Sequence, residues 1–251
     1  MSAIAVSSIV FASIFGSGLV GMVVRRAIPE DYLGQGEKEV ARLVTGLMTT
    51  MAAIVLGMLV SSAKASYDAR TNEVAEISSE VVAIDRMMSK YGAETAEVRA
   101  QFRMLVEANI NRIWPAQAPV NVELKPRDDG EILVDQLQLL APKSDVQAQV
   151  KTQILGMVVE LRKTQWNLFL KSKQAALPIP LLLVVVSWLA LIYLSFGLFT
   201  PPSPTIVVTL VFGALAATGA VLIILELYTP FRGILRISSG PILEALSQMG
   251  R

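Results

Sequence analysis

Four long apolar segments, two near each end of the chain, constrain what this sequence can fold into. A helix needs about 20 predominantly apolar residues to cross the hydrocarbon core of a bilayer, and each segment meets that length. The sequence therefore predicts an all-α membrane protein with four transmembrane helices. The segments are Ala3–Val24, Leu43–Ala63, Leu177–Phe199 and Thr205–Leu227.

Charge is concentrated between the second and third apolar segments. Residues 64–176 hold 15 of the 22 Lys and Arg residues and 15 of the 21 Asp and Glu residues. Such a charged insert is expected to fold outside the bilayer. We therefore expect four parts: transmembrane helices 1 and 2 in residues 1–63, an extramembrane helical domain in 64–176, a transmembrane hairpin of helices 3 and 4 in 177–227, and an interfacial segment in 228–251.

Composition excludes several classes of function. The chain has no Cys and no His, which removes disulfides, thiol nucleophiles, zinc sites and histidine acid–base catalysis. The net charge of +1 gives no reason to expect a nucleic-acid partner. The run from Asp128 to Glu131 lacks the alternating oxygen ligands of an EF-hand, so it predicts a solvated turn. We expect no enzymatic activity, no cofactor and no metal, and we expect membrane lipids as partners.

The second apolar segment is predicted to continue beyond the bilayer. No Gly or Pro occurs between Lys64 and Gly92, so one helix can run from Leu43 to Tyr91, about 70 Å at 1.5 Å per residue. Its outer part carries a heptad-like apolar seam. The seam consists of Val74, Ile77, Val81, Ile84 and Met88.

Three further helices are predicted in the insert: Thr95–Trp114, Glu131–Leu140, and one that begins near Asp145 and reaches the membrane boundary at Lys171 and Lys173. Because the last leads into the third apolar segment, we expect the bundle to be built on extensions of transmembrane helices 2 and 3. Its predicted apolar side consists of Val146, Val150, Ile154, Met157, Val158 and Leu161.

Small and weakly polar residues form a stripe along the second apolar segment. Such a stripe permits close packing between helices in lipid, which is the simpler interpretation. The alternative is a pore-lining face, since hydroxyls and exposed backbone suit a wet path. The stripe consists of Gly46, Thr50, Ala53, Gly57 and Ser61, with Thr45 and Thr49 beside it.

Glu226 is the acidic residue within the fourth apolar segment. An ionisable residue in the membrane is a functional candidate because it is costly to bury without a partner. Glu226 lies in the last turn, however, so an interfacial ion pair with Arg232 or Arg236 is the favoured role, with gating as the sharper alternative. Four spans place both termini and the charged insert on one side of the membrane, and the bias of Lys and Arg favours the cytoplasmic side.

Two stretches resemble a known family. The first runs from Gly57 to Arg70, and the second, from Leu225 to Leu243, follows the pattern E-L-x-x-P-F-x-G-x-[IL]-x-I-S-S-x-P-[IL]. Both are similar to the bestrophin-like domain family of bacterial and plant membrane proteins, and the likeness extends over nearly the whole chain. The resemblance implies a bacterial inner-membrane protein.

True bestrophins are pentameric ion channels with four membrane helices, extended cytosolic helices and a second helix that lines the pore. The resemblance therefore implies a homo-oligomer, with a pentamer favoured, that conducts inorganic ions and prefers anions. The second helix lacks an aromatic-rich neck, and no acidic calcium clasp follows the fourth, so the resemblance does not extend to calcium gating. The competing hypothesis is a non-conducting scaffold or assembly factor whose helical domain recruits a partner.

Overall fold

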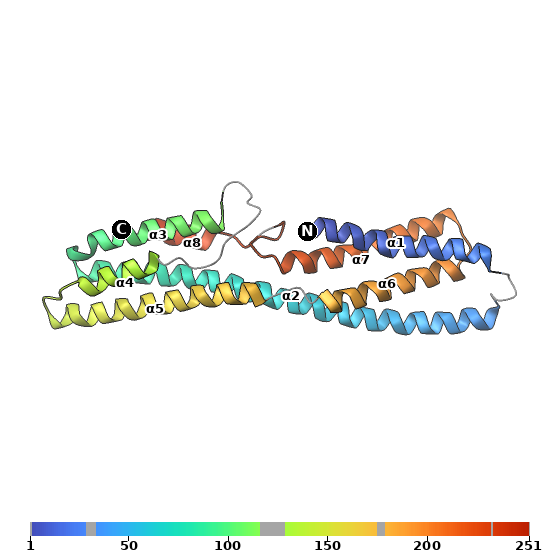
Figure 1. Ribbon diagram of the computed structural model, residues 1–251, viewed down its shortest axis with the longest axis horizontal. Helices are drawn as coiled ribbons and strands as arrows, with labels where there is room; N and C mark the ends of the chain where they lie inside the picture. Colours follow the sequence, from blue (N-terminus) through green and yellow to red (C-terminus); the bar gives the residue numbers. More distant parts are fainter. Residues whose placement is uncertain (1, 29–33, 116–128, 175–178, 232, 251) are drawn as a thin grey trace. The chain divides into compact units, whose positions relative to one another are not determined.

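The computed structural model describes residues 2–28, 34–115, 129–174, 179–231 and 233–250, and the ribbon is drawn in Figure 1. These residues form α-helices and one short 3-10 helix, and no strand occurs among them. The predicted all-helical class is confirmed. The chain divides into two compact units: unit 1 comprises Met1–Ser66 and Ala176–Thr229, and unit 2 comprises Tyr67–Ala175 and Pro230–Arg251.

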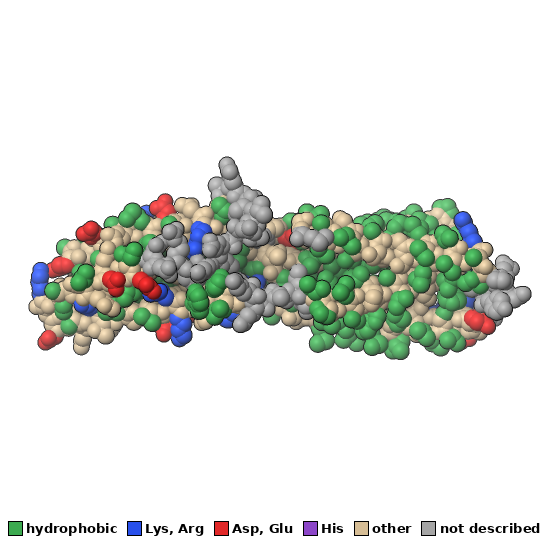
Figure 2. Space-filling model, viewed as in Figure 1, with side chains coloured by type: hydrophobic (Ala, Val, Ile, Leu, Met, Phe, Trp, Pro, Cys, Tyr) green, Lys and Arg blue, Asp and Glu red, His purple; other side chains and the backbone are tan. Residues whose placement is uncertain are grey.

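Unit 1 contains the four apolar helices, each long and apolar enough to cross a membrane. Ser2 and Ser203 begin two of them as N-caps, their hydroxyls accepting from the backbone N–H of Ala5 and Ile206. Figure 2 shows hydrophobic side chains over most of the visible surface of this unit. The helices are α1 (Ala3–Ala27), the first part of α2 (Gln35–Tyr91), α6 (Ile179–Phe199) and α7 (Pro204–Leu227).

Helix α2 begins earlier than predicted, at Gln35 instead of Leu43. The predicted connector up to Arg42 is therefore helical from Gln35. Its residues Glu37 to Arg42 include no Gly or Pro and are mostly good helix formers, and Glu37 lies in the first turn, where a negative charge favours the helix dipole. The apolar segment starts at Leu43 because these charged residues precede it, but charge does not prevent them from being helical.

Helix α2 then continues without a break to Tyr91, as the absence of Gly and Pro after Lys64 predicted. It ends because Gly92 adopts φ +134°, a backbone conformation that L-residues with side chains rarely adopt. The 57 residues of α2 correspond to about 85 Å of helix at 1.5 Å per residue.

Unit 2 is a helical bundle around one apolar core. The predicted seam of α2 supplies Val81, Ile84 and Met88 to this core, which also contains Phe102 and Leu137. Val146 was predicted on the buried side of α5 but is 67% exposed, because the core reaches α5 only from Val150. The bundle comprises the second part of α2, a 3-10 turn (Ala93–Thr95), α3 (Ala96–Ile113), α4 (Asp129–Leu139), α5 (Asp145–Gln174) and α8 (Gly240–Gln248).

Two predictions on the helix connections have different outcomes. The solvated turn predicted for Asp128 to Glu131 is wrong from Asp129 onward, since α4 begins at that residue. Asp128 lies outside the described residues. The predicted continuity of α5 into α6 stays a prediction. Helix α5 ends at Gln174 and α6 begins at Ile179, and the residues between them lie outside the described part.

The segment after α7 is anchored within unit 2. The indole Nε1–H of Trp114 donates to the carbonyl of Ile237 at 2.9 Å, and the Trp114 ring packs edge-on against Phe231 with centroids 5.9 Å apart. Phe231 and Ile237 are buried with Val74 and Leu168 in a small apolar cluster. Phe231 and Ile237 therefore anchor this segment in unit 2.

Candidate functional site on helix α2

The small-residue stripe is exposed within the single chain. Its members are Gly46, Thr50, Ala53, Gly57 and Ser61, and Thr49 beside them is also exposed. A Cβ atom added at Gly46 or Gly57 would meet no atom within 4 Å. Within the described part of the structure, packing inside one chain therefore does not explain why these residues are small.

Thr45 lies apart from the other candidates. It is only 8% exposed, and its hydroxyl is 2.9 Å from the hydroxyl of Ser195 on α6. Ala52, Leu59 and Ala63 continue this buried side of α2 at helical spacing. Helix α2 thus packs within unit 1 through the side that carries Thr45, and the stripe occupies another side.

The hydroxyls beside the stripe bond within the helix. Thr49 Oγ1 donates to the carbonyl of Thr45 at 2.7 Å, and Thr50 Oγ1 donates to the carbonyl of Gly46 at 2.8 Å. Such bonds satisfy the hydroxyl proton in a membrane helix and leave the oxygen lone pairs available as acceptors. The face therefore presents small side chains and hydroxyl oxygens, without a formal charge.

The third side of α2 in unit 1 carries large apolar residues, and we call it the large-residue face. This side is exposed and strongly apolar, which suits contact with lipid or with another copy. It borders the stripe on one flank of the helix. Its members are Leu43, Val44, Leu47, Met51, Ile54 and Met58.

Elsewhere in unit 1 small residues do serve packing within the chain. A Cβ at Gly21 of α1 would collide with backbone atoms of Leu194 and Gly197 on α6, and a Cβ at Gly197 would collide with the backbone of Gly18. Neither Gly18 nor Gly197 was singled out from the sequence. Those two belonged to no regular stripe, so their only signal was glycine in an otherwise bulky apolar run.

Glu226 is 5% exposed at the end of α7. Its predicted ion pair stays a prediction, since Arg232 lies outside the described residues and Arg236 is an exposed residue of unit 2. No group of three or more His, Cys, Asp or Glu side chains that could hold a metal ion occurs among the described residues.

Unit 2 carries its own buried ion pair. Asp85 is 3% exposed and accepts two hydrogen bonds from Arg99, at 3.0 and 2.9 Å. Its Oδ2 also accepts from the backbone N–H of Gly250 at 3.2 Å, and Arg103 donates to the carbonyl of Met249 at 2.6 Å. This group of charges fastens the end of the chain to α2 and α3.

Two other carboxyl groups of unit 2 have shifted pKa values. Burial, reinforced by Glu76 and Glu160, raises the pKa of Glu80, against a hydrogen bond from Thr164 that lowers it. The hydrogen bond from Lys143 lowers the pKa of Glu94, and that pair lies at the surface.

Comparison with known proteins gives one match. The sequence profile described as the Bestrophin-like domain matches residues 10–242. The match includes the stripe of α2 and the segment that Trp114 anchors. No curated protein and no solved structure matches the chain.

Proposed function

Because this chain belongs to the bestrophin-like domain family, we propose that it assembles with copies of itself into an ion channel whose pore is lined by α2. The family and the four long apolar helices make it an integral membrane protein. Under this proposal unit 1 crosses the bilayer, and unit 2 lies outside it as a cytoplasmic vestibule. Membrane lipids and other copies of the chain are then its partners, and inorganic ions its cargo.

The observation that carries the proposal is the open space beside the stripe. In lipid, small residues let helix backbones approach closely, so such a stripe normally marks a contact. A Cβ added at Gly46 or Gly57 would meet no atom of another part of the chain within 4 Å, whereas one added at Gly21 or Gly197 of the same unit would collide with backbone atoms. This contrast supports a use of the stripe that needs more than one copy of the chain.

The three sides of α2 fit a helix placed around a central axis. The side with Thr45 packs on its own chain, the small stripe can face the axis, and the side with Met51 and Met58 can meet lipid or an adjacent copy. Hydroxyl oxygens on the axis side offer acceptors to hydrated ions and waters. The stripe carries no charge that would select one sign, so the preference for anions rests on the family alone.

The proposal predicts no enzymatic activity. It also predicts an oligomer with a wet axis, for which the family favours five subunits. A monomer, or a ring whose axis is filled with lipid, would support the non-conducting scaffold instead.

The natural absence of cysteine makes the test direct. Single variants Ala53→Cys on the stripe and Met51→Cys on the large-residue face place one thiol each in a thiol-free chain, and both positions are exposed in the single chain. Reconstituted in liposomes, wild type should carry a chloride flux. A charged methanethiosulfonate reagent should block the flux of A53C and leave that of M51C unchanged.

Two results would contradict the proposal. One is the absence of chloride, sodium or potassium flux from preparations shown to be oligomeric by crosslinking. The other is a flux that the reagent blocks equally in both variants, since this would show that the stripe does not line the pore in preference to the large-residue face.

A further inference from the structure

Unit 1 has an open groove along one flank of α2, between its first turns and helix α6. Val40, Val44 and Met48 form the apolar wall on α2, and Leu191 lies on the side of α6. The three residues of α2 recur every four positions, so they share one face of the helix. All four helices of this unit are long and apolar enough to cross a membrane, so a groove on their outer surface opens toward lipid.

The groove carries one formal charge among its described lining residues. That charge belongs to Glu37, in the first turn of α2. The hydroxyls of Thr45 and Ser195 also line the groove, but they lie 2.9 Å apart and bond to one another. A ligand in the groove would therefore meet an apolar wall with a carboxylate at one end.

The groove has the depth of a lipid headgroup together with the upper part of an acyl chain. Helix α2 rises about 16 Å from Glu37 to Met48, at 1.5 Å per residue. The apolar segment begins at Leu43, about 9 Å from Glu37 and about 8 Å from Met48 along the helix. Because the headgroup region is about 5–8 Å thick on each side of the hydrocarbon core, Glu37 lies near headgroup level and Met48 lies among the acyl chains.

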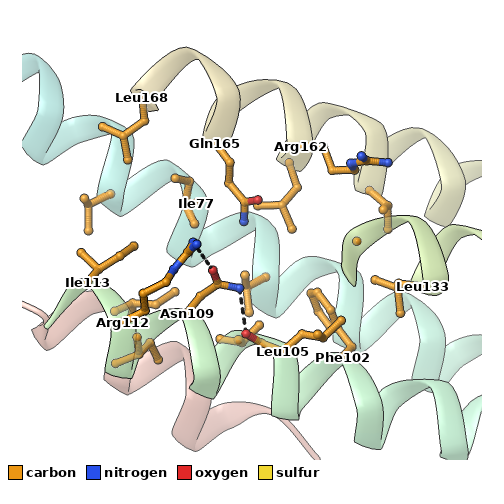
Figure 3. A pocket seen from close by; sticks show the side chains of 18 of the residues that line it. Ile77, Phe102, Leu105, Asn109, Arg112, Ile113, Leu133, Arg162, Gln165 and Leu168 are labelled. Carbon is orange, nitrogen blue, oxygen red and sulfur yellow. Dashed lines mark hydrogen bonds between the residues drawn. The ribbon is translucent and has the colours of Figure 1, made fainter. Parts of the chain in front are cut away.

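The groove differs in its charged group from the part-open pocket of unit 2, which is drawn in Figure 3. In that pocket Arg112 donates to Asn109 at 2.7 Å, and Arg162 pairs with Glu131 at 3.3 Å. The cations of the pocket are thus engaged by side chains of the chain itself. Among the described residues no cation pairs with Glu37.

We propose that the groove between α2 and α6 binds a phospholipid whose headgroup ends in a primary ammonium, such as phosphatidylethanolamine. The carboxylate of Glu37 would accept charge-assisted hydrogen bonds from the ammonium, and an acyl chain would lie along Val40, Val44 and Met48. A choline headgroup carries the same charge but has methyl groups in place of the N–H donors, so it cannot form these bonds. The open side of the groove needs no protein cover, because the surrounding lipid closes it.

The inference requires that unit 1 lies in a bilayer, but it does not require ions to pass. A channel and a non-conducting scaffold could both hold a lipid here, so the test measures lipid binding and not flux. The failure of one proposal therefore leaves the other standing.

The experiment measures lipid binding to the full chain by native mass spectrometry in a mild detergent. Phosphatidylethanolamine and phosphatidylcholine with identical acyl chains are added in equal amounts, so only the headgroup differs. We expect saturable binding of one ethanolamine lipid per subunit, at least about tenfold tighter than the choline lipid.

Two glutamine variants test the carboxylate. Glu37→Gln should reduce the preference for the ethanolamine lipid to within about twofold, because a neutral amide forms weaker hydrogen bonds with the ammonium. Glu39→Gln is the matched control, since Glu39 is an exposed carboxylate of the same helix and is not among the lining residues of the groove. It should keep the preference of wild type.

Two tryptophan variants test the groove itself without changing charge. Val44→Trp fills the groove and should weaken binding of the ethanolamine lipid by about tenfold or more, whereas Leu43→Trp, at an exposed position outside the groove, should stay within about twofold of wild type. Both variants are first checked for the subunit number and unfolding midpoint of wild type.

Three results would overturn the proposal. The first is equal binding of the two lipids to wild type, and the second is an equal preference in E37Q and E39Q. The third is a V44W variant that binds lipid as wild type does but has a changed subunit number, since a second copy of the chain would then fill the groove.

Discussion

Removal of the charge at Asp85 should destabilise unit 2 more than any surface charge change. Asp85→Asn keeps the shape of the side chain but leaves Arg99 without its carboxylate. Breaking a fully buried ion pair costs about 3–5 kcal/mol. The side chain of Asp85 is 5% exposed but that of Arg99 is 21% exposed, so water can replace part of the lost interaction.

We therefore expect a loss of about 2–3 kcal/mol, which for a chain of this size lowers the unfolding midpoint by about 5–10 °C. The assay is thermal unfolding in detergent followed by far-UV circular dichroism. Glu94→Gln is the matched control, because the Glu94–Lys143 pair joins the same kinds of charge at the surface. Its midpoint should be unchanged at physiological salt.

A double-mutant cycle then separates the pair from its surroundings. Asp85→Asn and Arg99→Gln, alone and together, should give a coupling free energy of about 1.5–3 kcal/mol, as for directly hydrogen-bonded charges. Equal melting of D85N and E94Q, or a coupling energy near zero, would refute the reasoning that burial makes this pair important. Because Asp85 also accepts from Gly250, D85N should in addition speed carboxypeptidase removal of the last residues.

Three further predictions concern other parts of the chain. Glu80→Gln should raise the unfolding midpoint at neutral pH, because the raised pKa of the Glu80 carboxyl means that the folded state disfavours its charge. The gain should shrink as pH falls and vanish below the ordinary pKa of 4.5, and an unchanged midpoint at neutral pH would contradict this reasoning. Gly21→Leu should reduce the yield of folded protein, whereas Gly46→Leu, whose Cβ would meet no atom of another part of the chain within 4 Å, should fold but alter oligomer size on native gels. Normal yield of G21L would contradict the packing of α1 on α6. Trp114→Phe removes the hydrogen bond to Ile237 and should cost about 1 kcal/mol, with faster proteolysis after Thr229; unchanged proteolysis would show that this bond does not hold the segment.

The helical elements were largely predictable because their signals are local. Apolar length marks a membrane-spanning helix without reference to any other part of the chain, and the four segments appear as four helices. The end of α2 at Gly92 and the burial of Val81, Ile84 and Met88 followed from glycine chemistry and heptad spacing. The start of α2 was misplaced because charged residues favour helix and loop alike when no Gly or Pro decides between them.

The composition of the α2 stripe could be recognised in the sequence, but the environment of the stripe could not be predicted from it. Gly21 and Gly46 are chemically identical, and only the tertiary structure places one against the backbone of α6 and the other in open space. Thr45 and Thr49 likewise differ through one neighbour, Ser195, which lies 150 positions from Thr45 along the chain. The Asp85–Arg99 pair likewise forms only where α2 and α3 pack together. Periodicity and composition are properties of one segment, whereas burial and pairing depend on which other segment lies opposite.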